Sequence, residues 1–139
     1  MRADRLYFED VEVNTVLESP GITVTEAHVG FYAGLTGDLA PMHGAVPDLL
    51  PLTLTTGLGW RVPQPPLVVL AFLGVEWEML RPLAVGDTMF GRSRFLSKRP
   101  MRDGGLIVEA REVVDQRGEV VQRGRFTYLV AKRAKEARA

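Results

Sequence analysis

The sequence predicts an α+β domain in which an antiparallel sheet wraps around one buried helix. Three observations support this prediction. Apolar residues occur in two helical segments before residue 61, whereas β-forming residues dominate from residue 67 onward. The later segments are joined by short turns that contain glycine, which is typical of antiparallel neighbours. No segment repeats, and the 139 residues are suited to one domain, 1–139.

The first part of the chain is predicted to be extended and then helical. Residues 11–25 contain β-forming side chains, interrupted by the turn dipeptide Pro20-Gly21. Thr25 is a suitable N-cap for the helix that follows, and Gly37 is suited to end it, because glycine adopts the left-handed conformation easily. His28 falls in the first turn, where we expect a surface or helix-end position.

A second helix is predicted over residues 49–60. Asp48 is a good N-cap, and Pro51 falls in the first turn, where its missing N–H has no intrahelical partner in any case. Leucines lie around much of the circumference, so we expect this helix to be the buried one. Threonine hydroxyls within it are expected to donate to preceding carbonyls.

Four strands are predicted after the second helix. Residues 67–77 form a nearly continuous apolar run, which predicts a central strand covered on both faces. Residues 88–98, 105–114 and 119–131 follow, and a hairpin turn ending at Gly118 joins the last two. A sheet packed on one helix leaves other surfaces and edges to be covered, so we expect a homodimer.

Composition excludes several function classes. Seventeen basic and seventeen acidic residues balance, so we expect neither nucleic acid nor a membrane surface as a partner. The chain has no cysteine and only two histidines, far apart, which argues against a zinc site, and we expect no metal and no cofactor. The opening residues lack a signal-peptide pattern, which predicts a cytoplasmic protein. The basic tail over 132–139 is expected to be solvated.

Acid–base chemistry near neutral pH therefore depends on very few side chains. His43 follows Asp38 by five residues, across a turn that Pro41 stiffens. A carboxylate and an imidazole at this spacing can hold one water molecule between them, which suits adding water to a substrate or removing it. The alternatives are that Asp38 caps the turn after Gly37 and that His43 only bonds a backbone carbonyl.

Two motifs in this order resemble a known family. They are Gly37-Asp38-x-x-Pro41-x-His43 and Arg81-Pro82-x-x-x-Gly86-Asp87. Together with the segments around them, they are similar to those of the MaoC-like (R)-specific enoyl-CoA hydratases and dehydratases of the hot-dog superfamily. The resemblance spans about residues 7–131, which we take as the core of the domain.

The resemblance implies a hot-dog fold, a dimer and an acyl-thioester substrate, carried by CoA or by an acyl-carrier protein. It implies that Asp38 and His43 activate the water. It also implies substrate binding by Gly44, Asp48 and Leu49, where a backbone N–H at the start of the buried helix polarises the thioester carbonyl.

The sequence departs from the family pattern in three features. Ala40 replaces an asparagine, the segment between His43 and the second helix is short, and Asp48 replaces the glycine that supplies the oxyanion N–H. Two other functions therefore stay open: an acyl-binding or partner subunit without turnover, and an acyl-CoA thioesterase in which Asp38 activates water. A basic cluster is expected to be a solvated face, with the CoA phosphates as an alternative ligand; it comprises Arg92, Arg94, Lys98, Arg99 and Arg102.

Overall fold

The computed structural model describes residues 4–39 and 45–134. Two α-helices, two short 3-10 helices and six strands make up this part of the chain. The elements, in chain order, are η1 (Phe8–Asp10), β1 (Leu17–Glu18), β2 (Ile22–Thr23), α1 (Glu26–Thr36), α2 (Leu50–Leu58), η2 (Gly59–Arg61), β3 (Val69–Met79), β4 (Thr88–Met101), β5 (Gly104–Asp115) and β6 (Val120–Val130).

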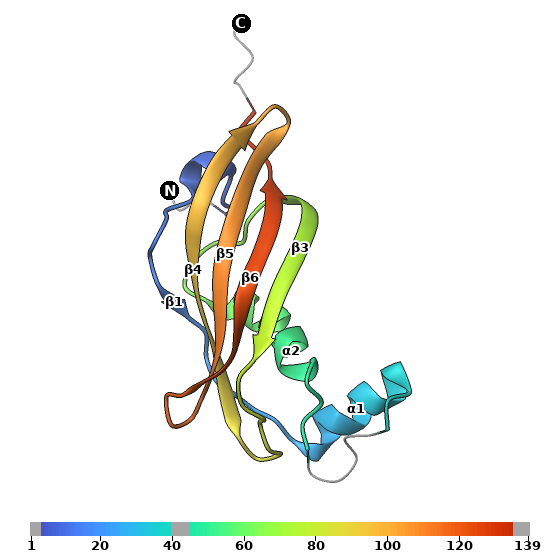
Figure 1. Ribbon diagram of the computed structural model, residues 1–139. Helices are drawn as coiled ribbons and strands as arrows, with labels where there is room; N and C mark the ends of the chain where they lie inside the picture. The colour runs from blue at the N-terminus through green and yellow to red at the C-terminus, as the bar shows by residue number, and fades with distance from the viewer. Residues whose placement is uncertain (1–3, 40–44, 135–139) are drawn as a thin grey trace, which may run out of the picture.

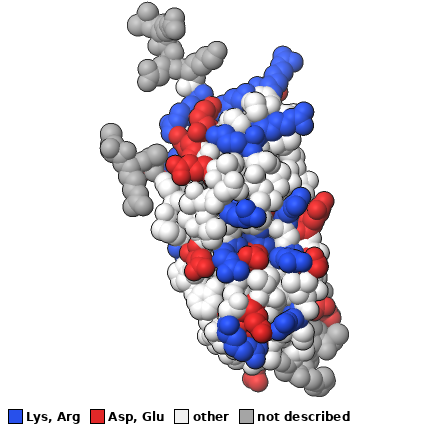
Figure 2. Space-filling model, turned by 60° about the vertical axis from the view of Figure 1, so that its left-hand side comes forward, with Lys and Arg blue, Asp and Glu red and all other residues white. Residues whose placement is uncertain are grey.

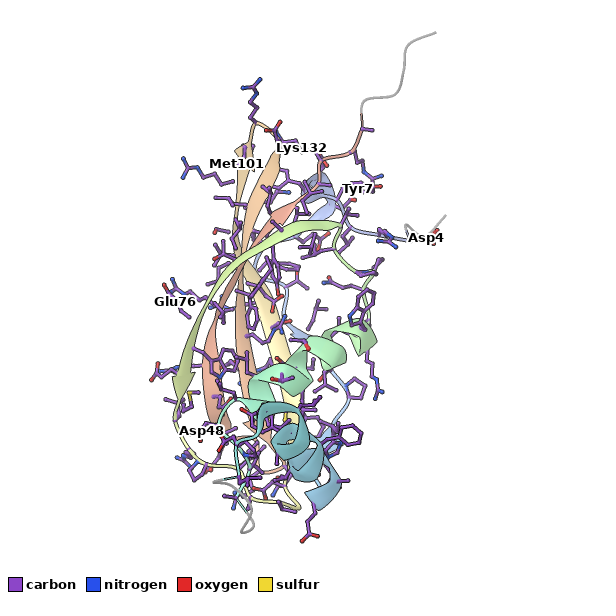
Figure 3. The ribbon with its side chains drawn as sticks, turned by 90° about the vertical axis from the view of Figure 1, so that its right-hand side faces the viewer. Asp4, Tyr7, Asp48, Glu76, Met101 and Lys132 are labelled. Atoms are coloured by element: carbon purple, nitrogen blue, oxygen red, sulfur yellow. The ribbon has the colours of Figure 1, made fainter. Side chains whose placement is uncertain are left out.

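The strands form one antiparallel sheet with the order β1-β4-β5-β6-β3, and β2 pairs with the end of β4. Both helices lie on the same side of this sheet (Figures 1 and 3). The α+β prediction of a sheet packed on one helix is confirmed. No helix in the described ranges is long and apolar enough to cross a membrane.

The main core lies between α2 and the concave face of the sheet. Leu50 and Leu58 of α2 pack with fully buried side chains from three strands, among them Met89, Val113 and Val121. A second apolar cluster forms around Ile107 at the other end of the sheet. The sheet therefore covers one face of α2, whereas Thr53, Thr56 and Gly57 on its other face are exposed, so the predicted burial holds for one face of the helix.

The predicted caps of the first helix and the predicted turn at Gly118 are confirmed. Gly118 has φ of 81° in the β5–β6 turn, a conformation that favours glycine. Gly37 ends α1 with φ of 75°. At the other end of α1, the Thr25 N–H donates to Nδ1 of His28 at 2.9 Å, which confirms a helix-end position for this histidine.

The predicted start of the second helix is wrong in one respect. Leu49, not Asp48, is the N-cap of α2, and the Asp48 side chain caps no N–H of the helix. The Asp48 carbonyl instead accepts a hydrogen bond of 2.8 Å from Nε2 of Gln122, and the Leu50 N–H donates to the carbonyl of Pro47. The contact with β6 thus fixes the Asp48 backbone, and the helix begins one residue later than predicted.

The apolar run after α2 is a strand, but it is not central. β3 pairs only with β6 and forms an edge of the sheet. Phe72 and Leu73 are 54% and 53% exposed, so the prediction of a strand covered on both faces is wrong for the single chain. A run of apolar residues shows that a strand needs cover, but it does not show whether that cover comes from the same chain.

Candidate functional site

The segment that joins α1 to α2 contains most of the predicted site residues. Asp38 directly follows the C-cap of α1, is exposed, and donates its N–H to Oγ1 of Thr36 at 3.1 Å. In Figure 1 the C-terminal end of α1 is the end that lies farther from the sheet. His43 and Gly44 lie outside the described residues, so the pairing of Asp38 with His43 stays a prediction.

The start of α2 supplies hydrogen-bond donors. Asp48 and Leu49 are exposed, and their backbone N–H groups donate to no residue within 4–39 or 45–134. The first N–H groups of a helix have no intrahelical acceptor, and the helix dipole gives this end a partial positive charge. Such a position favours an oxygen that gains negative charge during a reaction.

A chain of hydrogen bonds connects the start of α2 to the edge strand. Nε1 of Trp77 on β3 donates to Oε1 of Gln122 at 2.8 Å, and Nε2 of Gln122 donates to the Asp48 carbonyl at 2.8 Å. Gln122 is 4% exposed, so both bonds are shielded from water. The position of the Asp48–Leu49 backbone therefore depends on the packing of β3 against β6.

Four polar side chains meet between the sheet and α2. Arg111 of β5 donates from Nε to Glu109 at 2.6 Å, from Nη1 to the Thr55 hydroxyl at 3.1 Å and from Nη2 to the Tyr128 hydroxyl at 3.0 Å. Its guanidinium also lies 4.0 Å from the ring centre of Phe126. Glu109 and Arg111 are both buried and form an ion pair. We call these two residues, together with Thr55 and Tyr128, the buried polar cluster.

The electrostatics of the buried polar cluster favour the charged form of Arg111. Burial alone would lower the pKa of Arg111, but the charge of Glu109 and the hydrogen bonds to Glu109 and Tyr128 raise it above its ordinary value. Burial, together with the nearby Glu109 charge, raises the pKa of Tyr128 to about 12. Tyr128 therefore stays a neutral hydroxyl at any physiological pH.

The buried polar cluster lines a cavity of about 170 Å³, which we call the inner cavity. Its other walls are formed by residues of the 58–69 segment, by Phe95 and Arg92, and by small side chains such as Ser19. The inner cavity opens to solvent near the exposed Trp60, and its combination of apolar walls with a few fixed polar groups is typical of a small-molecule site. Asp38, Asp48 and Leu49 do not line it.

Sequence reasoning missed the buried polar cluster, although β5 contains a signal for it. Side chains two apart on a strand share one face, so Glu109 and Arg111 share the face of Ile107 and Val113, which are fully buried. Two charged residues at core positions of a strand indicate either a site or a buried ion pair. The Thr55 hydroxyl, which also donates to the Leu52 carbonyl, completes the cluster from α2.

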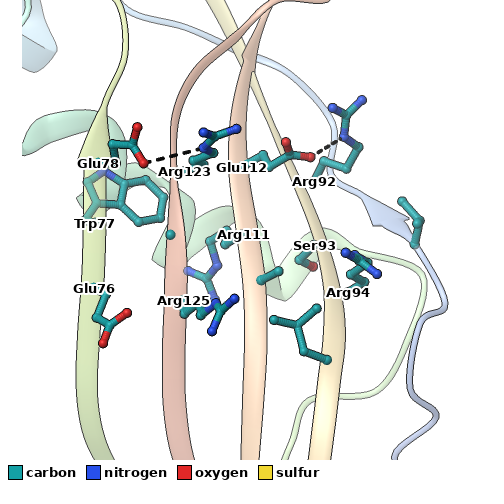
Figure 4. A pocket seen from close by; sticks show the side chains of 14 residues that line it. Glu76, Trp77, Glu78, Arg92, Ser93, Arg94, Arg111, Glu112, Arg123 and Arg125 are labelled. Carbon is teal, nitrogen blue, oxygen red and sulfur yellow. Dashed lines mark hydrogen bonds and ion pairs between the residues drawn. The ribbon is translucent and has the colours of Figure 1, made fainter.

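The opposite face of the sheet carries rows of alternating charge (Figure 2). One row crosses the strands in register, and its ion pairs are Arg92–Glu112 at 2.9 Å and Arg123–Glu78 at 3.7 Å (Figure 4). The row lines an open groove of about 890 Å³. Arg92 of the predicted basic cluster is thus paired within the chain, as expected for a solvated face.

No group of three or more potential metal ligands occurs among residues 4–39 and 45–134.

The architecture defines a hot-dog domain, in which an antiparallel sheet packs around a helix. Comparison with solved structures supports this assignment of the fold. A monoamine oxidase regulatory protein from Archaeoglobus fulgidus matches with a TM-score of 0.86 over 96% of this chain and 100% of its own, at 25% identity. The MaoC-like dehydratase from Rhodospirillum rubrum matches with a TM-score of 0.77 over 94% of this chain and 99% of its own, at 22% identity.

Further neighbours extend this result. The (R)-hydratase PhaJ1 from Pseudomonas aeruginosa has a TM-score of 0.75 over 96% of this chain and 92% of its own, at 19% identity. A Mycobacterium tuberculosis protein with a double hotdog fold matches all of this chain with 48% of its own length, at 19% identity and a TM-score of 0.76. No family model and no curated protein matches the sequence. The structural neighbours of this chain are therefore MaoC-like dehydratases and (R)-hydratases with the hot-dog fold.

Proposed function

We propose that this protein adds water to acyl thioesters and removes it, converting trans-2-enoyl-CoA to the (R)-3-hydroxyacyl thioester and back. One observation carries the proposal. The segment containing Asp38 and His43 leads directly into the buried helix α2, in a fold shared with an (R)-hydratase and a MaoC-like dehydratase. The thioester, on CoA or on an acyl-carrier protein, is the substrate, and we assign the reaction no cofactor.

The proposed reaction uses the donors at the start of α2. Asp38 and His43 hold the water between them; one accepts its proton while the oxygen bonds to the β-carbon, and the other helps to deliver a proton to the α-carbon. Charge that develops on the thioester oxygen is stabilised by the N–H groups of Asp48 and Leu49, and we assign Gly44 to substrate binding as well. The Asp48 carboxylate near these donors opposes that charge, so we expect a modest rate.

Purified protein mixed with crotonyl-CoA is expected to remove the enoyl absorbance. We expect His43→Ala and Asp38→Asn each to slow this reaction at least about a hundredfold, because each removes a proton-transfer group. His28→Ala is the matched control, since this histidine caps α1 and has no proposed part in the chemistry.

Three outcomes would contradict the proposed hydratase. Full activity in both site variants would remove Asp38 and His43 from the mechanism. Release of free thiol without loss of the enoyl group would identify a thioesterase. Silence in both assays, with short and long acyl chains, would identify an acyl-binding or partner subunit.

We propose, in addition, that two copies of the chain form a homodimer through β3. This strand is an edge with unpaired backbone groups on one side, and it exposes large apolar side chains on both faces, among them Leu70, Phe72 and Leu73. The Mycobacterium tuberculosis neighbour, of which this chain matches 48%, has a double hotdog fold, which supports the pairing of two such units.

Light scattering is expected to give twice the mass of the 15.4 kDa chain. The change Leu73→Lys, at the centre of β3, is expected to shift the protein toward the monomer because it places a charge in the proposed interface. Val16→Lys is the control: Val16 is equally exposed, at 56%, but lies beside β1 at the opposite edge. A monomer in the unmodified protein, or equal effects of both changes, would overturn the dimer through β3.

A further inference from the structure

We propose that the inner cavity binds the far end of the acyl chain and prefers a chain that ends in a neutral hydroxyl group over an apolar chain. The inference rests on the proposed function, since it takes the ligand to be an acyl thioester. It assigns a specificity role to Glu109 and Arg111, which have no part in the water chemistry proposed above.

The inner cavity lies along the helix whose start is the proposed thioester site. Thr55 and Leu58 of α2 both line the cavity. Thr55 comes five residues after Leu50, which corresponds to about 7.5 Å along the helix axis at 1.5 Å per residue. A thioester held at the start of α2, with its chain running beside the helix, would therefore place the end of a medium-length chain at the buried polar cluster.

The buried polar cluster has unused donors and an unused acceptor. A guanidinium has five N–H groups, and Arg111 uses three of them, for Glu109, Thr55 and Tyr128, so two have no acceptor among residues 4–39 and 45–134. Glu109 accepts through Oε2, while its Oε1 accepts no hydrogen bond from the described residues. Both side chains line the cavity, so these groups can reach a ligand there.

This combination selects the chemistry of the ligand. A terminal hydroxyl can accept from Arg111 and donate to Glu109 at once. A carboxylate would meet the Glu109 charge, and an ammonium group would meet the charges of Arg111 and of Arg92, which also lines the cavity. A methyl end would leave the polar groups unpaired, and sites built to bind a hydroxyl discriminate strongly against analogues that lack it.

The test compares two saturated ligands of equal length, octanoyl-CoA and ω-hydroxyoctanoyl-CoA. Calorimetry is expected to show at least about tenfold tighter binding of the hydroxylated ligand. The corresponding trans-2-enoyl thioesters are expected to show the same preference in kcat/KM. Because the saturated ligands cannot be hydrated, the binding preference is measured whether or not the protein is a hydratase.

The paired change Glu109→Leu with Arg111→Met makes the cavity apolar without leaving an unpaired charge. It is expected to abolish or reverse the preference. The matched control is Glu78→Leu with Arg123→Met, which removes both members of an ion pair on the outer face of the sheet; neither residue lines the inner cavity, so the preference is expected to remain. The selectivity ratio does not depend on the fraction of folded protein, so reduced stability cannot mimic the result.

The outcomes separate the two proposals. A tenfold binding preference without turnover supports the inner cavity and rejects the hydratase. Turnover with equal affinity for both ligands rejects the inner cavity and keeps the hydratase. Failure to bind either ligand, or an unchanged preference in the Glu109→Leu/Arg111→Met variant, also overturns the inference.

Discussion

Replacing Arg111 with leucine is expected to lower the free energy of unfolding by about 3–5 kcal/mol. The change removes the partner of Glu109, which is 7% exposed and has no second cation among its hydrogen-bond partners in the described residues. An uncompensated carboxylate in the interior is strongly destabilising. The Thr55 and Tyr128 hydroxyls lose the same donor. Urea unfolding followed by tryptophan fluorescence measures the effect.

Two comparisons isolate the cause. Arg123→Leu breaks an ion pair with Glu78 whose side chains are 54% and 59% exposed, and it is expected to cost less than about 1 kcal/mol. The Glu109→Leu/Arg111→Met variant removes both charges and is expected to regain most of the lost stability. Equal losses for Arg111→Leu and Arg123→Leu would show that burial of the cluster does not determine its energetics.

Replacing Gly124 with alanine is expected to lower the free energy of unfolding by about 3 kcal/mol, because overpacking here meets backbone. A Cβ atom at Gly124 would overlap the carbonyl oxygen of Glu76 and would lie 2.7 Å from Cε3 of Trp77. Both residues belong to β3, where Trp77 is directly opposite Gly124 in the register and Glu76 is its neighbour. Because a backbone carbonyl cannot turn away as a side chain can, β3 would have to move away from β6. Thermal or urea unfolding measures the loss.

Gly74→Ala is the matched control for Gly124→Ala. Gly74 lies on β3 itself, and a Cβ atom there would meet nothing within 4 Å. Its replacement is expected to change stability by less than about 0.5 kcal/mol. The Gly124 variant is also expected to alter the fluorescence of Trp77, which donates to Gln122 and so supports the start of α2. Similar stability of the two variants would contradict the close packing of β3 on β6.

Local signals in the sequence were sufficient for most elements of the fold. Four predictions depend on neighbours close in the chain, and each is confirmed: the Thr25 cap, the Gly37 cap, the turn at Gly118 and the last three strands. The Asp48 cap failed because a distant residue, Gln122, holds the Asp48 carbonyl. Propensity describes what a side chain can do locally, and a tertiary hydrogen bond can override it.

For the candidate site, too, local patterns in the sequence predict some residues and miss others. Asp38, His43, Gly44, Asp48 and Leu49 are predicted from motifs and from the family resemblance, and their roles stay predictions. The structure adds that the N–H groups of Asp48 and Leu49 have no acceptor in the part of the chain that it describes. The buried polar cluster was not identified, since Thr55, Arg111 and Tyr128 are far apart in the chain and meet only when α2 packs on β5 and β6.

The sequence by itself determined the order of helices and strands, the turns, and the residues with the right chemistry for activating water. Those properties follow from backbone preferences and side-chain periodicity over a few residues. Only the tertiary structure decided that the apolar strand β3 is an exposed edge and that a charge pair lines a cavity beneath α2. Both depend on which distant segments pack together, and packing is set by the burial of the whole chain rather than by any local pattern.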